Sequence, residues 1–183
     1  LQQNANFGLS MLAYDLRHTN LNTASSQKVN NRIEGSGVIL SSANLPSLVR
    51  PGVESTYFTA QNISNDATGS NKSDQITIQF VPELRGEPRY DCEGELMVVS
   101  RTYVYRYYLE KLPTNQQIDG ALDRFGLYCD SGYYTASMNK IEGLGSNGQL
   151  VIQNVDAFKV RFLVKDKDGN LTYATINKYE TDL

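Results

Sequence analysis

A run of residues near the end of the chain in which every second residue is apolar is the feature that most constrains the fold. From Ala157 to Lys165 the apolar positions fall on every second residue, with basic residues among the positions between them. The apolar members are Phe158, Val160, Phe162 and Val164, and the basic members are Lys159, Arg161 and Lys165. A period of two predicts a strand with one buried face. Asp168-Gly169 then predicts a hairpin turn, with a return strand from Leu171 to about Tyr179.

Similar strand patterns occur through the middle of the chain. Residues 76–80 alternate Ile, Thr, Ile, Gln and Phe, which predicts a half-buried strand that ends at Pro82. Residues 96–109 are rich in Val and Tyr and predict one long or broken strand. Residues 125–129 alternate again, so we expect a tight turn to pair them with the preceding strand, and residues 149–152 predict a further short strand. The polar residues from 62 to 73 predict an exposed loop between two of these elements.

The first 21 residues predict a helix. Apolar residues at steps of four and three form one stripe, which consists of Leu1, Ala5, Leu9, Leu12 and Leu16. A second apolar side is formed by Phe7, Met11 and Tyr14. The simpler interpretation is a helix that covers a sheet, and the sharper one is a helix that also contacts neighbouring subunits. The helix starts without a capping residue, which indicates a chain truncated from a longer protein.

The order of these elements predicts an α+β fold, in which an N-terminal helix packs on one face of an antiparallel sheet. We expect a single domain over residues 1–183, with the helix at 1–21 and mostly strands and loops from 35 to 183. A net charge of -3 without a long basic run argues against a protein that binds nucleic acid by neutralising phosphates. No stretch of the printed sequence approaches the roughly 20 apolar residues that a membrane span needs.

The two cysteines, Cys92 and Cys129, predict one disulfide and an oxidising compartment. The alternative is two unrelated buried thiols. Zinc is disfavoured because two cysteines and a single histidine do not complete four ligands.

Few residues point to catalysis, and we expect neither an enzyme nor a cofactor site. His18 is the only histidine, and its place in the last helical turn suits the helix dipole better than a role as general base. Glu93 and Glu95 could form a carboxylate pair, but two solvated charges near Cys92 are the favoured interpretation. Asp166, Asp168 and Asn170 resemble part of a calcium loop. The glycine is misplaced for such a loop, so a plain hairpin is favoured and a calcium site stays a minor alternative.

Three tyrosines alternate along one predicted strand face, namely Tyr103, Tyr105 and Tyr107. They are interpreted as a core ladder, with a recognition surface as the alternative.

Four blocks of sequence, taken in order, resemble one known family. The first is LQQNANFGLSMLAYDLR at residues 1–17, which is close to a family pattern of roughly L-Q-x-N-x-x-F-A-L-x-x-L-x-x-D-L-R, with Gly8 in place of Ala and Tyr14 where Arg is common. The second is SDQITIQF at 73–80. The third combines DCxG at 91–94 with LYCD at 127–130, and the fourth is IQNVDAFKVRF at 152–162. Together they resemble the PilW family of type IV pilus minor pilins.

The resemblance implies a pilin-like fold and a structural role. A basic leader cleaved by prepilin peptidase and an apolar helix in the inner membrane would precede this chain. The protein would be periplasmic before assembly and then part of the extracellular pilus, where it primes polymerisation and supports twitching motility and adhesion. Its partners would be other minor pilins and, with them, the tip adhesin and the major pilin. We expect Leu1, Phe7, Met11 and Tyr14 to form the partner interface, and we expect no nucleic acid and no small-molecule substrate.

Three other functions compete with this hypothesis. The related minor pseudopilin J of type II secretion fits the helix and the tail equally well, and the cysteine pair favours the pilus. An extracellular binding module would use the tyrosine face. A hydrolase with an unrecognised site is the weakest alternative, because the chain has a single histidine.

Overall fold

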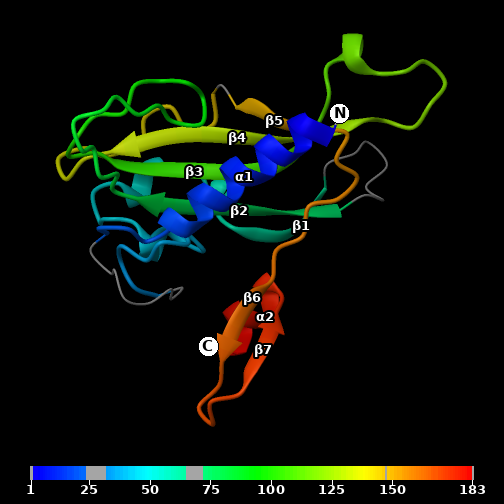
Figure 1. Ribbon diagram of the computed structural model, residues 1–183. Helices are drawn as coiled ribbons and strands as arrows, with labels where there is room; N and C mark the ends of the chain where they lie inside the picture. The colour runs from blue at the N-terminus through cyan, green and yellow to red at the C-terminus, as the bar shows by residue number, and fades with distance from the viewer. Residues whose placement is uncertain (1, 24–31, 65–71, 147, 183) are drawn as a thin grey trace.

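The structure is a computed structural model that describes residues 2–23, 32–64, 72–146 and 148–182. Two helices flank the strands in sequence, as Figure 1 shows. The helices are α1 (Gln2–His18) and α2 (Ile176–Asp182). The strands are β1 (Ala60–Ser64), β2 (Lys72–Phe80), β3 (Thr102–Lys111), β4 (Phe125–Tyr134), β5 (Gln149–Gln153), β6 (Phe162–Lys165) and β7 (Leu171–Ala174). Short 3-10 helices lie at Ser42–Asn44, Arg50–Gly52, Ser55–Tyr57 and Thr114–Gln116.

The main sheet has five strands in the order β1-β2-β3-β4-β5, and each strand is antiparallel to its neighbours. Its centre is the β3–β4 pair, which runs without a register shift from Thr102 opposite Tyr134 to Lys111 opposite Phe125. The fold is therefore α+β, with an N-terminal helix on an antiparallel sheet, as the sequence predicts. This arrangement is consistent with a pilin-like fold.

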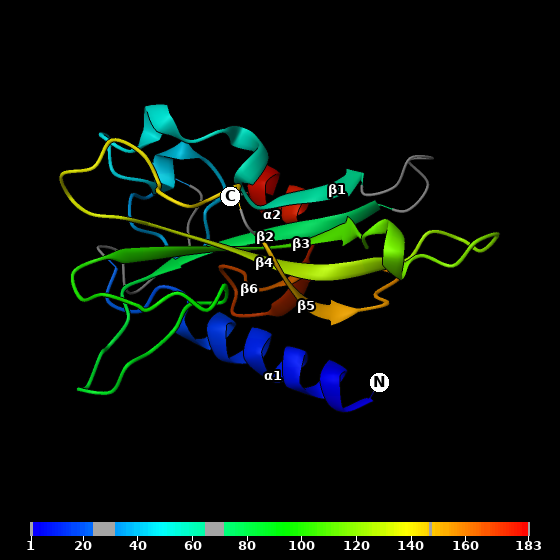
Figure 2. The same cartoon turned by 90° about the horizontal axis from the view of Figure 1, so that it is seen from above.

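Helix α1 lies along one face of the sheet (Figure 2). Its buried line is formed by Gly8, Leu12 and Asp15, with Ala5 half-buried. The steps of three and four between these residues place them on one side of the helix. Gly8 permits close approach, because a Cβ atom there would lie 2.7 Å from the Val151 carbonyl oxygen of β5.

The predicted stripe is therefore rotated relative to the observed one. Leu9 and Leu16 are exposed rather than buried, and a carboxylate occupies the last buried position. A hydrophobic pattern alone could not place a glycine and an aspartate on the buried line.

The face of the sheet under α1 is aromatic and aliphatic. Tyr103, Tyr105 and Tyr107 are buried there, so the prediction of a core ladder is confirmed and the alternative of a recognition surface is wrong. They pack with residues of β2 and β4, and Phe80 makes an edge-on contact with Tyr105 at a centroid distance of 5.0 Å.

On the opposite face of the sheet, the side chains of β2 are polar but also covered, and Val104 and Tyr134 join a second apolar cluster there. From Ser73 to Phe80 every residue of β2 is buried, so the prediction of a half-buried strand is wrong. Gln75 donates to the carbonyls of Thr56 and Phe58, and Gln79 donates to that of Ser36 at 2.6 Å. Loop carbonyls thus replace water as partners for the polar side chains, which makes their burial tolerable.

The C-terminal hairpin forms where Asp168-Gly169 predicts it, with β6 paired to β7. The predicted return strand ends early, at Ala174 instead of Tyr179. Thr175 explains the change, because its hydroxyl accepts a hydrogen bond from the Lys178 amide at 3.2 Å and caps the start of α2. Ile176 and Tyr179 then join the core of the main sheet.

Three other predicted boundaries change. Residues 96–101 are not in a strand, β1 and β2 extend into the predicted loop at 62–73, and β3 joins β4 through a long connection from Leu112 to Arg124 rather than a tight turn. The alternation of burial from Phe158 to Lys165 is observed, but only Phe162–Lys165 is a strand. Earlier in this segment the amides of Phe158 and Val160 bind side chains of β2 instead of a partner strand.

Candidate interaction surfaces

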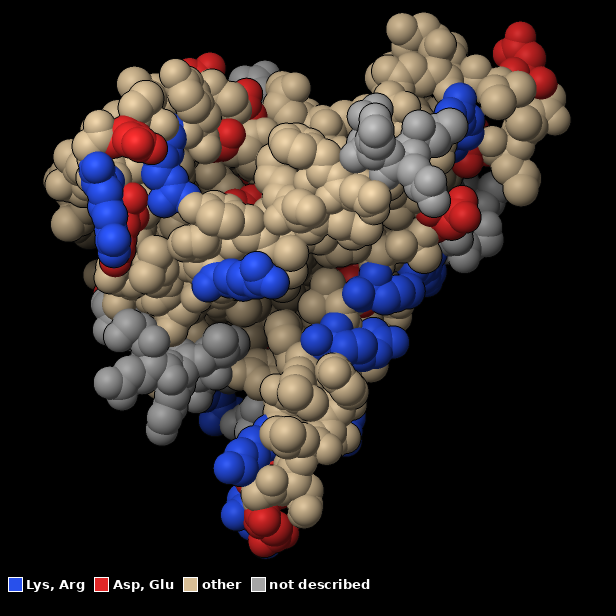
Figure 3. Space-filling view, viewed as in Figure 1, with Lys and Arg blue, Asp and Glu red and all other residues tan. Residues whose placement is uncertain are grey.

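The outward-facing sides of α1 carry several exposed apolar side chains. Exposed fractions are 73% for Phe7, 53% for Leu9, 44% for Tyr14 and 39% for Leu16. Figure 3 shows that the surface over α1 is mostly uncharged. Large apolar side chains left exposed together on one element are typical of surfaces that bind another protein.

These side chains form two flanks rather than one stripe. Phe7 and Tyr14 are seven residues apart and share one side of the helix, and Leu9 and Leu16 share another in the same way. At 100° per residue, the exposed Ser10 and the other polar residues of the solvent side lie between the two flanks. The helix therefore offers one apolar strip on each side of its buried line.

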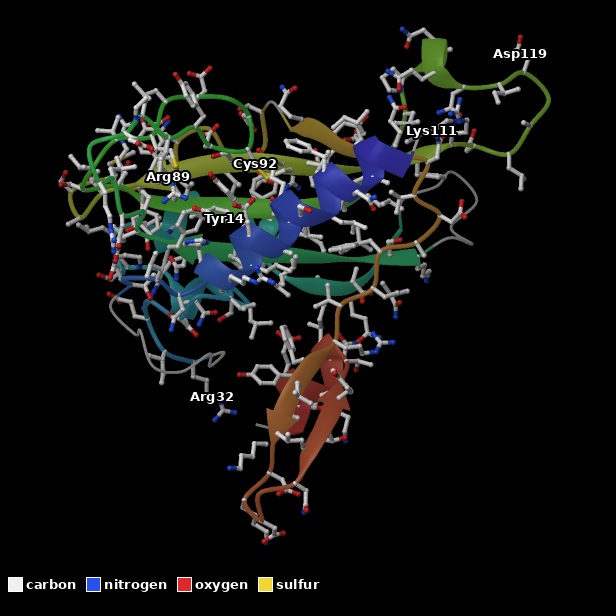
Figure 4. The ribbon with its side chains drawn as sticks, viewed as in Figure 1. Tyr14, Arg32, Arg89, Cys92, Lys111 and Asp119 are labelled. Atoms are coloured by element: carbon white, nitrogen blue, oxygen red, sulfur yellow. A yellow bond between two sulfur atoms is a disulfide. The ribbon has the colours of Figure 1, made fainter. Side chains whose placement is uncertain are left out.

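The structure places the predicted interface residues unequally. Phe7 is free of the core, Met11 is half-buried, and Leu1 lies outside the described residues. Tyr14 already has partners within the chain: its ring lies 4.1 Å from that of His18, and the Arg89 guanidinium lies 5.3 Å above it (Figure 4). Leu9 and Leu16 belong to the predicted buried stripe, although their spacing of seven matches that of Phe7 and Tyr14.

A buried hydrogen bond fixes α1 on the sheet. The Tyr107 hydroxyl of β3 donates to the carboxylate of Asp15, and both side chains are buried. Burial raises the pKa of Asp15 above its ordinary value, while the hydrogen bond from Tyr107 and the nearby His18 act in the opposite direction. This contact fixes the rotation of the helix and, with it, the direction of the two flanks.

The predicted disulfide is present and joins Cys92 to Cys129, with their Cα atoms 6.1 Å apart. Cys129 is buried in the middle of β4, so the bond anchors the segment between β2 and β3 over the same side of the sheet as α1. A disulfide is typical of proteins from an oxidising compartment, which is consistent with a periplasmic or extracellular location.

The acidic residues beside Cys92 hold the backbone in place. The Asp91 carboxylate accepts from the amides of Glu93 and Glu95, both at 2.9 Å, and from the Ser131 hydroxyl at 2.8 Å. Glu93 accepts from the Ser131 amide at 2.9 Å. Burial raises the pKa of Glu93, and the charges of Asp130 and Asp91 add to this. The prediction of two solvated charges is therefore correct for Glu95 and wrong for Glu93, which is half-buried.

A polar groove of about 1280 Å³ is lined from both sides of the sheet, by Arg106 and Tyr108 on the face opposite α1 and by Asp91 and Glu93 on the α1 side. Arg106 of this lining forms an ion pair with the buried Asp130, with nitrogen and oxygen 2.7 Å apart. The guanidinium also lies over the rings of Tyr57 and Tyr108, at 4.7 and 4.1 Å. Asp130 accepts in addition from the Gly145 amide at 2.9 Å. These bonds tie the loop around Gly145 to the sheet, and burial raises the pKa of Tyr108 to about 12.

The remaining sequence candidates have local roles. His18 lies at the end of α1, where its Nδ1 is 2.7 Å from the carbonyl oxygen of Tyr14. The Asp166 carboxylate accepts from the amides of Asp168 and Asn170, which closes the hairpin turn. Within the part of the chain that the structure describes, His, Cys, Asp and Glu do not form a group of three or more that could hold a metal ion.

Among the described residues, neither helix is long and apolar enough to cross a membrane. No protein-family model, curated protein or solved structure matches the chain.

Proposed function

We propose that the chain is the extracytoplasmic domain of a minor pilin of the type IV pilus, of the PilW kind. The observation that carries this proposal is helix α1, which packs on the sheet through one line of residues and keeps two apolar flanks exposed. A filament built by packing helices side by side needs such flanks, because each subunit contacts neighbours on both sides of its helix.

The fold gives further support. The Asp15–Tyr107 hydrogen bond fixes how α1 is rotated, so the flanks point in constant directions in every copy. The disulfide suits a protein that functions in the periplasm and then outside the cell. In the proposed protein an apolar helix continues α1 upstream and anchors it in the inner membrane, and the partners are other minor pilins, the major pilin and the tip adhesin.

Replacing apolar residues of each flank tests the proposal. The variant Phe7→Ser with Leu9→Ser removes one exposed apolar residue from each flank, and neither side chain is in the core. We expect an unchanged thermal midpoint, at least a roughly tenfold loss of affinity for the organism's other minor pilins in co-purification, and few surface pili when the variant complements a deletion strain. The matched control is Leu48→Ser, which removes an exposed leucine on the side of the sheet away from α1.

The outcome distinguishes the competing functions. Normal pili in the deletion strain, with a loss of protein secretion, would identify a type II secretion pseudopilin instead. Unchanged association and unchanged piliation in the flank variant would contradict the use of α1 as an interface.

A further inference from the structure

The connection between β3 and β4 carries the most exposed large apolar side chain in the described part of the chain. Leu122 is 92% exposed and Ile118 is 58% exposed, and both lie in the segment between Leu112 and Arg124. The segment projects away from the sheet in both Figure 1 and Figure 2. A leucine this exposed contributes nothing to the core and is available for contact outside the chain.

The base of this projection is held by side-chain hydrogen bonds. The Gln117 side chain donates to the carbonyls of Leu112 and Arg124, at 2.7 and 3.0 Å, and accepts from the Arg124 amide at 2.8 Å. Arg124 donates to the Gln116 carbonyl at 2.7 Å. Lys111 and Asp123 form an ion pair of 2.6 Å across the same base. The tip is therefore presented in a defined position, which lowers the entropy lost when it binds.

The tip lies at the same end of the molecule as the start of α1. Both views place the N-terminus and the β3–β4 connection at one end of the sheet, and Figure 4 shows Asp119 at the far point of the projection. In the proposed function, the helix that continues α1 upstream leaves the molecule at this end and enters the membrane. The end that carries Leu122 then faces the bilayer before assembly.

We propose that the β3–β4 tip, through Leu122 and Ile118, rests in the interfacial layer of the bilayer while the subunit is membrane-anchored. This inference depends on the proposed function, because it needs the upstream membrane helix. The chemistry fits a lipid surface that is neutral rather than strongly anionic: the tip presents two apolar side chains beside the acidic Asp119, and Lys111 is paired with Asp123. With a membrane helix as the main anchor, the tip acts as a second contact that sets the tilt of the domain.

The printed sequence contains no tryptophan, which permits a direct test. The full-length protein with Leu122→Trp is reconstituted into phosphatidylcholine vesicles, with or without brominated acyl chains, which quench tryptophan fluorescence on contact. We expect at least about a twofold loss of emission, because a side chain at the headgroup–acyl boundary lies within reach of the bromines. The matched control is Leu48→Trp, at an exposed site on the side of the sheet away from α1, and we expect no quenching there. Emission of the unsubstituted protein is subtracted.

Each result has one interpretation. If the protein resists alkaline extraction but the emission of the Leu122→Trp variant is not quenched, the tip does not contact lipid and this inference is wrong, while the proposed function stands. If the full-length protein is released by alkaline extraction, the anchored pilin is wrong and this inference fails with it. Emission that changes only when other minor pilins are added, without any effect of bromine, would assign the tip to a protein partner and overturn the lipid contact.

Discussion

Strand β2 is buried on both faces of the sheet, but the two faces are covered in different ways. Under α1, apolar side chains such as Ile78 and Tyr105 pack against a helix and against one another. On the other face, Gln79 and its polar neighbours of β2 bind the carbonyls of a loop, and Arg106 of β3 pairs with Asp130 of β4. The α1 face therefore depends mainly on packing, whereas the other face combines a second apolar cluster, which includes Val104 and Tyr134, with hydrogen bonds that must all be made.

This difference shows what alternation along a strand can and cannot predict. The alternation of Ile, Thr, Ile, Gln and Phe in β2 correctly assigns residues to two faces. It does not predict that the polar face is shielded from water, because the shielding comes from a loop that is distant in sequence. The hydrogen bond from Gln75 to the Phe58 carbonyl, for example, joins residues 17 positions apart. The predictions below separate the two ways of covering a face.

The largest effect is expected from breaking the ion pair of the polar face. Asp130→Asn leaves the Arg106 guanidinium, which is only 13% exposed, without a counter-charge. We expect the free energy of unfolding to fall by about 3–5 kcal/mol, since a buried charge loses its partner. Urea denaturation measures this change. The control is Asp123→Asn, which breaks the largely exposed pair with Lys111 and is expected to cost less than about 1 kcal/mol. Equal losses in the two variants would contradict a special role for the buried pair.

A somewhat smaller effect is expected from removing the disulfide on the α1 side. The bond joins residues 37 positions apart. In the chain-entropy model, Cys92→Ala with Cys129→Ala lowers the free energy of unfolding by about 3–4 kcal/mol. We also expect faster proteolysis between β2 and β3, because the bond anchors that segment. A loss below about 1 kcal/mol, with unchanged cleavage, would show that the hydrogen bonds of Asp91 hold the segment without the bond.

The smallest effect is a change with pH at the helix–sheet contact. Burial raises the pKa of Asp15 above 3.8, so the folded state binds this proton more tightly than the unfolded state. Protonated Asp15 therefore contributes its full stabilisation at pH values below the ordinary pKa of an aspartate. This stabilisation is lost as the pH rises through the higher pKa that Asp15 has in the folded state. Asp15→Asn removes this dependence. We expect the variant to gain stability relative to the parent protein as the pH rises from about 4 towards neutrality, by less than the two preceding effects.

Thermal unfolding at a series of pH values measures that trend. Tyr107→Phe provides the comparison, because removing a hydrogen bond that lowers the Asp15 pKa moves the loss of stability to higher pH. A difference between parent and Asp15→Asn that does not change with pH would show that Asp15 keeps its ordinary pKa.

Most of the architecture follows from local patterns in the sequence. The helix, the central strands, the Asp-Gly hairpin and the disulfide are all predicted, because each depends on periodicity, turn chemistry or residue type. Helix α2 is not predicted, since a threonine cap overrides a strand pattern at Thr175. The long connection between β3 and β4 is not predicted either. The Gln117 side chain holds its two ends together through the carbonyls of Leu112 and Arg124, and the sequence pattern does not reveal this tertiary contact.

The exposed apolar flanks of α1 are predicted only in part. Phe7 and Tyr14 are exposed as expected, but the partners of Tyr14, Arg89 and His18, depend on the tertiary fold. The second flank is hidden in the sequence because Leu9 and Leu16 continue an apparent buried stripe. Only the buried Gly8 and Asp15 reveal the true rotation of the helix, and an aspartate at a core position cannot be anticipated without its partner Tyr107.

Burial of β2 on both sides also determines how the sheet is aligned. A shift of β2 by one residue would turn Gln79 and Thr77 towards the tyrosines and leave Ile78 facing the carbonyls of the loop. Such a slip costs little only in a strand whose two sides are similar, whereas here it would fail on both faces at once. The strand therefore has a single acceptable alignment, and mispaired forms of the sheet are disfavoured while the chain folds.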